Sequence, residues 1–537
     1  MPDLLLFNGK LTTQDPNFPN ATAIALRDGH ILAVGSDSEI KALATTHTRQ
    51  VDLHGQRVLP GLTDAHIHFY EWALLLSGLA LEDTASLSEV QFRLREAVSR
   101  SQPGEWILGQ GWNQERWTEV RLPSRADLDA IAPHNPVILW RTDLHLAWVN
   151  TAALEAAGIN AQTPAPPMGV IDRDPDGQPT GILRELAINL VRQVMPTTSD
   201  DSTDAAMRQA MTKVHQLGLT GVHDFRIMGG DDGPPALRAW QRLRAAGDLQ
   251  LRAWVMIPGE LVEQAATLGL QSCLGDDFLR IGGAKFFADG ATGARTSWML
   301  EPFEDGGSGL PLTPMAALTH GISIAHQAGI STAIHAIGDR AIRELLDVYS
   351  EVLGQQAGRS GPRVPHRIEH VQHSHPDDLK RLAPLGLVAS VQPLHLGDDL
   401  HMVEKAIGQR SRWTYAFREL LDAGTVLAFG SDCPVSSPNP FLGIYTAVTR
   451  QQRDGTPIGG WYAEQCLTVA EAVWGYTMGC AIASGQEQHQ GSLTPGKLAD
   501  LVVLDRDIFA IPLQEIADTQ VMMTLFDGRI VYHQSDI

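Results

Sequence analysis

Short apolar runs alternate with longer stretches of mixed polarity through the middle of the chain. Apolar runs of this length, bounded by turn residues, are typical of buried strands, and the stretches between them are long enough for helices. The expected strands are residues 58–69, 281–287, 331–335, 367–370, 387–391 and 426–430. This alternation predicts βα units and a parallel sheet, as in a (β/α)8 barrel.

The two ends of the chain show a different pattern. Residues 4–7, 23–26 and 31–34 near the start, and 501–504 and 521–525 near the end, are short apolar runs, and an Asp-Gly turn occurs in each region. We expect one small β-sandwich built from residues 1–57 and 484–537, around a barrel domain at 58–483. Two unrelated terminal ribbons are the alternative. Residues 83–204 are Trp- and Pro-rich and predict a large insertion near the barrel mouth, with a sheet of its own.

Composition narrows the choice of partners. The chain has 537 residues, with 62 Asp and Glu against 41 Lys and Arg and a formal net charge of −21. Such a balance argues against nucleic acid or an anionic membrane as a partner. No apolar run approaches the roughly 18 residues of a membrane span, and no secretory signal is evident. The four cysteines are scattered without a disulfide pattern, so a cytoplasmic protein is expected.

Candidate chemistry begins in the segment 58–69, VLPGLTDAHIHF. Residues i and i+2 of a strand point to the same side, so His66 and His68 are expected to converge. Two neutral imidazoles form half of a transition-metal site, with Asp64 as an expected acceptor for one of them. Two ordinary histidines at a strand end are the alternative.

Four more potential ligands follow, each on or just after a separate expected strand: Lys285, His335, His370 and Asp432. The carboxyl ends of barrel strands carry the active sites of this architecture. A charged lysine is a poor ligand, but carbon dioxide added to its amine makes a carbamate that bridges two cations. Each residue alone is more often a satisfied polar group, and Asp432 has the alternative of a helix N-cap. Together, in this order, they predict a metal centre.

The motifs resemble those of the amidohydrolase superfamily. The series is G-L-T-D-A-H-I-H, K-F-F-A-D-G, I-H-A-I-G-D-R-A, R-I-E-H-V-Q, S-V-Q-P-L-H and F-G-S-D-C-P-V, with G-S-L-T-P-G-K-L-A-D-L-V-V-L-D near the end. More narrowly, it is similar to amidohydrolase family 3, the branch of YtcJ-like proteins and N-substituted formamide deformylases. The likeness covers essentially the whole chain.

The resemblance implies a distorted TIM barrel holding one or two divalent metal ions, with Zn²⁺ expected. By position, His66 and His68 would hold the more buried metal, with Asp432 as a further ligand. His335 and His370 would hold the second, and a carboxylated Lys285 would bridge the two. In this branch residues 141–145 commonly read R-x-D-G-H, whereas this chain has Leu144 in place of the glycine.

The expected reaction is hydrolysis of a non-peptide C–N bond in a small amide by metal-bound hydroxide, with Asp432 as proton shuttle. His395 is expected to polarise the carbonyl, or else is a structural histidine. Two other functions stay open: a cyclic-amide hydrolase or deaminase on the same centre, and a non-enzymatic regulatory protein on this scaffold.

Further residues are expected to contact the substrate. Trp72, Trp117 and Trp148 fall in segments expected near the barrel mouth, and ordinary core positions are their alternative. The substrate-binding candidates are Trp112, His145, Glu185, Trp298 and Arg340. An aromatic lining would suit a small amide with a hydrophobic N-substituent. A homodimer is expected.

Overall fold

The computed structural model describes residues 1–19, 21–76, 78–119, 121–142, 144–167, 169–227, 233–355 and 361–534. Its centre is an eight-stranded parallel sheet in the order β20-β19-β18-β17-β16-β15-β14-β7. The strands are β7 (Leu62–Ile67), β14 (Leu219–Asp224), β15 (Arg252–Pro258), β16 (Leu279–Phe287), β17 (Thr332–Ala336), β18 (Arg367–His370), β19 (Val388–Val391) and β20 (Val426–Phe429). Six of them lie where the apolar pattern predicts strands, and β14 and β15 were not predicted.

The sheet curls so that its two edge strands meet. Just beyond β20, the backbone N–H of Asp432 donates to the carbonyl of His66 over 2.7 Å, and the N–H of His68 donates to the carbonyl of Cys433 over 2.8 Å. These bonds join the end of β20 to the end of β7. The predicted distorted (β/α)8 barrel is therefore confirmed.

Helices surround the barrel, and their apolar faces make its outer core. In α11 (Asp339–Gln355), Ile342, Leu345, Leu346, Tyr349 and Val352 follow helical spacing, and all five are buried. The other long helices are α7 (Asp200–Gln216), α8 (Gly233–Ala246), α10 (Met315–Ala328), α12 (Pro393–Ile407) and α14 (Pro440–Thr449). Shorter ones are α2 (Phe69–Leu75), α6 (Asn189–Arg192), α9 (Val262–Thr267), α13 (Phe417–Asp422), α15 (Val469–Trp474) and α16 (Cys480–Ala483).

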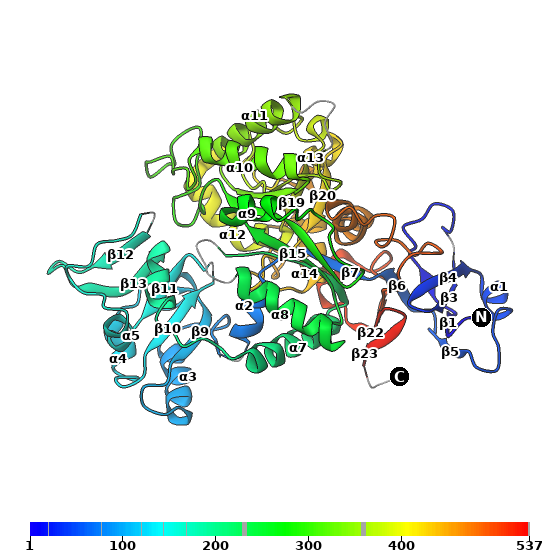
Figure 1. Cartoon of the computed structure of the whole chain (residues 1–537), viewed down its shortest axis with the longest axis horizontal. Coiled ribbons are helices and arrows are strands. Elements are labelled where there is room, and N and C mark those ends of the chain that lie inside the picture. The colour runs from blue at the N-terminus through cyan, green and yellow to red at the C-terminus, as the bar shows by residue number, and fades with distance from the viewer. Residues whose placement is uncertain are drawn as a thin grey trace.

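Both ends of the chain form the predicted sandwich (Figure 1). One sheet has the order β4-β3-β1-β5 and the other β2-β6-β21-β22-β23, in which β6 and β21 pair antiparallel. The strands are β1 (Leu4–Phe7), β2 (Lys10–Leu11), β3 (Ala23–Arg27), β4 (His30–Gly35), β5 (Arg49–Asp52), β6 (Arg57–Pro60), β21 (Leu501–Leu504), β22 (Val521–Phe526) and β23 (Arg529–His533), with α1 (Asp37–Lys41) beside them. Leu6, Ile24, Val58, Val503 and Leu525 belong to one buried cluster of residues from both ends.

The insertion has a sheet of its own, on the opposite side of the barrel from the sandwich (Figure 1). Its strand order is β12-β13-β11-β10-β9-β8. The strands are β8 (Leu79–Ala80), β9 (Ile107–Trp112), β10 (Val137–Arg141), β11 (Leu146–Val149), β12 (Gly169–Arg173) and β13 (Pro179–Glu185), with helices α3 (Leu87–Arg100), α4 (Arg125–Asp129) and α5 (Thr151–Ala156). The predicted insertion sheet is thus present.

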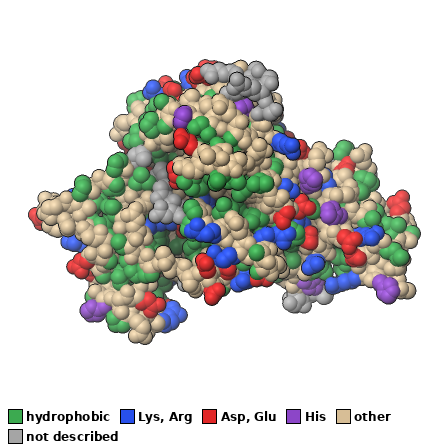
Figure 2. All heavy atoms as spheres, in the orientation of Figure 1, with side chains coloured by type: hydrophobic (Ala, Val, Ile, Leu, Met, Phe, Trp, Pro, Cys, Tyr) green, Lys and Arg blue, Asp and Glu red, His purple; other side chains and the backbone are tan. Residues whose placement is uncertain are grey.

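On the face drawn in Figure 2, Lys and Arg side chains lie among Asp and Glu rather than in one basic patch. Within the described residues, no helix is long and apolar enough to cross a membrane.

Candidate metal centre

A cavity of about 530 Å³ opens at the carboxyl ends of the barrel strands. Its walls come from the barrel, from α12 and from the insertion. All seven of the predicted metal-site and catalytic residues line it: His66, His68, Lys285, His335, His370, His395 and Asp432. The topology therefore brings together side chains that lie hundreds of residues apart in the sequence.

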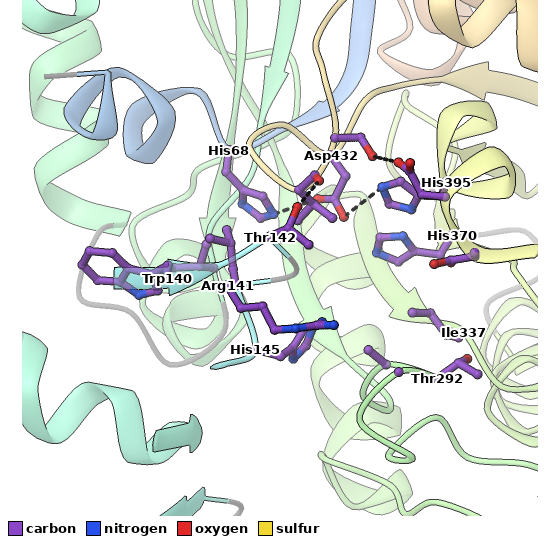
Figure 3. A pocket seen from close by; sticks show the side chains of 18 of the residues that line it. His68, Trp140, Arg141, Thr142, His145, Thr292, Ile337, His370, His395 and Asp432 are labelled. Atoms are coloured by element: carbon purple, nitrogen blue, oxygen red, sulfur yellow. Dashed lines mark hydrogen bonds and ion pairs between the residues drawn. The ribbon is translucent and has the colours of Figure 1, made fainter. Parts of the chain in front are cut away.

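Two groups of potential ligands share Asp432: His66 and His68 on one side, and His370 and His395 on the other. Figure 3 shows His68, His370 and His395 around the Asp432 carboxylate. His68 Nε2 lies 3.0 Å and His66 Nε2 3.4 Å from the same carboxylate oxygen, Asp432 Oδ1. His66, His68 and Asp432 are all buried. The two imidazoles converge as expected, although only His66 lies on β7 and His68 is the N-cap residue of α2. The segment after β20 supplies the carboxylate.

Each imidazole is held through its other ring nitrogen. His66 Nδ1 donates to Glu369 Oε2 over 2.7 Å, and His68 Nδ1 donates to the carbonyl of Phe225 over 3.2 Å. His370 Nδ1 donates to Gln392 Oε1 over 2.8 Å. Because Nδ1 carries the proton in each case, Nε2 offers a lone pair to the cavity, which is the tautomer a metal ligand needs.

Burial favours the neutral form of His66, His335 and His370. Burial, reinforced by the charge of Lys285, lowers the pKa of His66 to about 4. Burial likewise holds the pKa of His335 and of His370 well below the usual imidazole value. Neutral imidazoles are the form that binds metal.

Three buried polar atoms of cavity-lining residues have no hydrogen-bond partner among the described residues: Glu185 Oε1, His395 Nε2 and Asp432 Oδ1. The short distance from His68 Nε2 to Asp432 Oδ1 does not produce a satisfactory hydrogen-bond geometry. A buried polar atom without a partner is costly, whereas two imidazole nitrogens and a carboxylate oxygen around one point suit a divalent cation such as Zn²⁺. The residues present therefore fit a metal.

Lys285 is buried beside two aromatic rings, and its burial disfavours the charged amine. Nζ lies 4.7 Å from the ring centroid of Phe287 and 5.0 Å from that of Phe225. Within the described part of the chain, Lys285 Nζ makes no hydrogen bond or ion pair. Burial lowers the pKa of the amine to about 8, against the opposing charges of Glu369 and Asp432. A substantial neutral fraction near pH 8 suits addition of carbon dioxide.

His335 lies beside His370, with ring centroids 4.4 Å apart. Its Nε2 lies 3.4 Å from the carbonyl of Gly290. If Nε2 donates to this carbonyl, Nδ1 is left as the ligand nitrogen. Lys285, His335 and His370 thus occupy the wall of the cavity next to the group of His66, His68 and Asp432.

The backbone at Asp432 turns away from the strand. Asp432 has φ 59°, in the left-handed region that is uncommon for residues other than glycine. No helix of the described chain begins there, because the next one, α14, has Asn439 as its N-cap. The capping alternative for Asp432 is therefore wrong.

The prediction that Asp64 orients an imidazole is also wrong. Its carboxylate accepts the backbone N–H groups of His66 and Ser431, both at 3.0 Å, and the Ser431 hydroxyl at 2.5 Å. Asp64 thus fixes the contact between the ends of β7 and β20. Glu369 takes the imidazole-orienting contact instead.

The insertion supplies the outer wall of the cavity. Arg141, Leu144, His145 and Glu185 line it, and Asp143 lies outside the described residues. His145 Nδ1 donates to Glu185 Oε2 over 2.8 Å. Leu144 has φ 59°, a left-handed backbone that glycine adopts without strain.

Three expected substrate contacts are placed elsewhere. Trp112 is fully buried in the core of the insertion, where its indole N–H donates to the carbonyl of Leu139 over 2.7 Å. The Arg340 guanidinium stacks over the Trp298 ring at 4.8 Å, and neither residue lines the cavity. Trp72, Trp117 and Trp148 are likewise buried outside the cavity wall, and Trp140 is the tryptophan that lines it.

Sequence reasoning missed the residues that hold the imidazoles. Glu369 and Gln392 both lie inside quoted motifs, R-I-E-H-V-Q and S-V-Q-P-L-H, but neither was singled out. Arg367 and Glu369 stand two apart on a strand expected to be buried, and buried charges are almost always paired. That spacing was the available signal.

An eight-stranded barrel with a histidine and aspartate cluster at the carboxyl ends of its strands is the architecture of the amidohydrolases. The family model described as "Amidohydrolase family" matches residues 49–532, so the chain belongs to this family. The predicted family resemblance is confirmed.

Individual relatives cover nearly the full chain. Protein LONG AFTER FAR-RED 3 of Arabidopsis thaliana is 34% identical over 99% of this chain and 91% of its own. The N-substituted formamide deformylase of Arthrobacter pascens is 30% identical over 100% of this chain and 99% of its own. The crystal structure of an uncharacterized metal-dependent hydrolase from Pyrococcus horikoshii matches with a TM-score of 0.78 and 28% identity, over 95% of this chain and 99% of that one.

Proposed function

We propose that this protein is a metal-dependent hydrolase that cleaves the non-peptide C–N bond of a small amide with a hydrophobic N-substituent. The observation that carries the proposal is the convergence of His66 Nε2 and His68 Nε2 on Asp432 Oδ1, a buried oxygen without a hydrogen-bond partner among the described residues. The family membership and the formamide deformylase relative support the same reaction class.

His66, His68 and Asp432 would hold a divalent cation, for which we propose Zn²⁺. A divalent cation supplies Lewis acidity, which polarises a carbonyl and lowers the pKa of water from 15.7 to about 7. Asp432 accepts the proton of the attacking water and delivers it to the leaving nitrogen, because a carboxylate at this place reaches both. His395 Nε2, 3.9 Å from Asp432 Oδ2, is assigned to the carbonyl oxygen.

A second cation position is proposed at His335 and His370, with Lys285 carboxylated between the two positions. The support is the poorly solvated Lys285 amine, whose pKa is lowered by burial to about 8. Carboxylation replaces a cation between two aromatic rings with an anion that cations neutralise. Mass spectrometry of native protein in bicarbonate is expected to show the carbon dioxide adduct.

The hydrophobic part of the substrate is placed against the insertion. Leu75, Trp140 and Ile188 belong to one buried cluster, Leu144 packs against it, and all four line the cavity. The ionisable ligands of the barrel strands line the same cavity. An amide whose carbonyl is at the metal would present its N-substituent to these apolar side chains.

The decisive experiment compares Asp432→Asn with Asp398→Asn. The first substitution removes the proton-accepting carboxylate while nearly preserving shape, and loss of a general base typically costs about 10² to 10⁴ in rate. Asp398 also lines the cavity, but it is 46% exposed and pairs with Arg116 near the surface, at 3.4 Å. Such a pair contributes at most about 1 kcal/mol, so its loss is expected to change turnover little.

Turnover is measured on a panel of N-substituted formamides, with zinc content and unfolding followed for both variants. The expected result is a folded, metal-containing and nearly inactive Asp432→Asn protein. If that variant keeps more than roughly a tenth of wild-type turnover, which lies outside the range for loss of a base, the proton-transfer role is wrong.

A further inference from the structure

One carboxylate in the cavity wall has no part in the mechanism above. Glu185 ends β13 in the insertion sheet and lines the cavity. Its side chain is only 8% exposed. Oε2 accepts the Nδ1–H of His145, whereas Oε1 is buried without a hydrogen-bond partner among the described residues.

The backbone of Glu185 is strained. Its φ is 50° and its ψ is −131°, a combination that is essentially restricted to glycine and costs about 1–3 kcal/mol elsewhere. The residue is held there by its N–H, which donates to the carbonyl of His145 over 3.0 Å, and by pairing with Gly169 across the sheet. Strain of this kind gathers at ligand-binding positions.

The surroundings of Glu185 limit what its free oxygen accepts. Leu144 and Ile188 line the same cavity; Ile188 belongs to the apolar cluster of the insertion, and Leu144 packs against that cluster. An ionised carboxylate is an acceptor only, so its partner must donate a hydrogen. A ligand that combines an apolar body with a donor group satisfies both features.

We propose that Glu185 selects substrates whose apolar N-substituent carries a nitrogen-bound hydrogen, as an ammonium or an N–H group, which donates to Oε1. That this ligand is a substrate rests on the proposed amide hydrolysis. Its binding to Glu185 does not depend on that reaction. A hydrogen bond to a charged group contributes about 1.5–3 kcal/mol, which corresponds to roughly 10- to 150-fold in affinity.

The test uses three cyclohexylmethyl probes that share one apolar body. Cyclohexylmethylamine has charge and N–H donors, its N,N,N-trimethyl derivative has charge without a donor, and cyclohexylmethanol has a neutral donor. Binding to metal-loaded full-length protein is measured by calorimetry. Wild-type protein is expected to bind the amine at least about tenfold more tightly than the trimethyl derivative, in line with the strength of a charge-assisted bond.

Glu185→Gln is expected to remove this preference, and Glu115→Gln is the matched control. Glu115 also lines the cavity, but its side chain is 64% exposed at the mouth. Equal binding of the amine and the trimethyl derivative by wild-type protein would overturn the proposal. An unchanged preference in Glu185→Gln would overturn it too, since the amine would then be bound by another group, including the metal.

The failure of this inference is distinguishable from failure of the proposed function. Mono-N-formyl derivatives of 1,4-bis(aminomethyl)cyclohexane, in which the second nitrogen is either a free ammonium or a trimethylammonium group, report hydrolysis separately. If the protein hydrolyses the amides but Glu185→Gln leaves the preference between N–H and trimethylated substituents unchanged, only the selection by Glu185 is refuted. Probe selection by Glu185 in a protein that hydrolyses none of the amides refutes only the reaction. A melting temperature close to wild type for Glu185→Gln shows that the fold is retained.

Discussion

Gly430 is the point at which the last barrel strand touches the first, and its replacement by alanine tests how His66 is held. A Cβ atom built on Gly430 would lie 2.5 Å from the His66 backbone nitrogen and 2.9 Å from both His66 Cβ and Asp64 Oδ1. Contacts closer than 3.0 Å are essentially never seen for real Cβ atoms. The ends of β7 and β20 must therefore separate by about half an ångström to accept the methyl group, the kind of backbone shift that overpacking forces.

This separation acts directly on the proposed metal ligands. It stretches the bond from the Asp432 N–H to the His66 carbonyl, 2.7 Å long, and it displaces His66 relative to Asp432. Overpacking of this kind typically costs about 1–3 kcal/mol in unfolding free energy. Since metal sites require ligand distances within about 0.2 Å, zinc affinity is expected to fall as well.

Gly397 in α12 provides the matched control. It is also buried, but a Cβ there would meet nothing closer than the carbonyl oxygen of Gln451, at 3.7 Å, which is an ordinary contact. Glycine within a helix is less stable than alanine by roughly 0.5–1 kcal/mol, so Gly397→Ala is expected to stabilise the protein slightly.

The assay measures zinc content after dialysis against a weak chelator, together with denaturant unfolding of both variants. Gly430→Ala is expected to lose both zinc and stability, and Gly397→Ala neither. A Gly430→Ala protein with wild-type zinc affinity and stability would show that the strand contact does not fix His66, and the reasoning would fail.

Two further predictions concern the residues around the cavity. The Glu369 carboxylate accepts from His66 Nδ1–H over 2.7 Å and from Arg367 Nε–H over 2.6 Å, and in Glu369→Gln the amide NH₂ must face one of these two donors. Zinc affinity, measured by chelator competition, is therefore expected to fall about 10- to 100-fold. Unchanged affinity would exclude an orienting role for Glu369. Leu144 has φ 59°, and left-handed backbone costs roughly 1 kcal/mol for residues with a Cβ. Alanine usually gives a more stable protein than glycine, but here we expect Leu144→Ala to be less stable than Leu144→Gly by about 1 kcal/mol in unfolding free energy. Denaturant unfolding decides this, and a more stable alanine variant contradicts it.

The barrel was predictable where its strands are apolar and end in a potential ligand. β17 and β18 each place a histidine at or one residue before the end of a buried run, and that pairing marks both the strand and its functional end. β14 departs from the apolar pattern at His223 and Asp224, and β15 begins with Arg252 before an apolar run that was overlooked. Each of these polar groups has a partner in the structure: His223 accepts from Arg367, Asp224 pairs with Arg226, and Arg252 pairs with Asp500. Such pairing makes these residues compatible with burial. The partners of His223 and Arg252 come from distant segments and are not visible along one segment, whereas Asp224 and Arg226 stand two residues apart.

For the tryptophans, the sequence predicted the region of the fold but not the direction of the side chain. Trp112 and Trp148 lie in segments that do approach the barrel mouth, yet each is directed into the insertion by an indole N–H bond, to the carbonyls of Leu139 and Ser124. A buried indole needs an acceptor for its N–H as well as an apolar site. Which side of a sheet provides that acceptor depends on the strand register within the insertion, and the sequence pattern leaves that register open.

The backbone conformation at the cavity was beyond sequence reasoning, although its chemical groups were not. Leu144, Glu185, His370 and Asp432 all line the cavity and all have positive φ. None of them is a glycine or asparagine, the residues that mark such conformations in a sequence. Each is held by contacts from distant segments, as His370 is by Gln392 and Asp432 by the His66 carbonyl. Strain persists only where the surroundings over-determine the backbone. The geometry of this centre therefore depends on the barrel closure and on the insertion as much as on the ligands themselves. Gly430→Ala changes no ligand residue, and we expect it to alter metal binding because the added methyl group displaces His66.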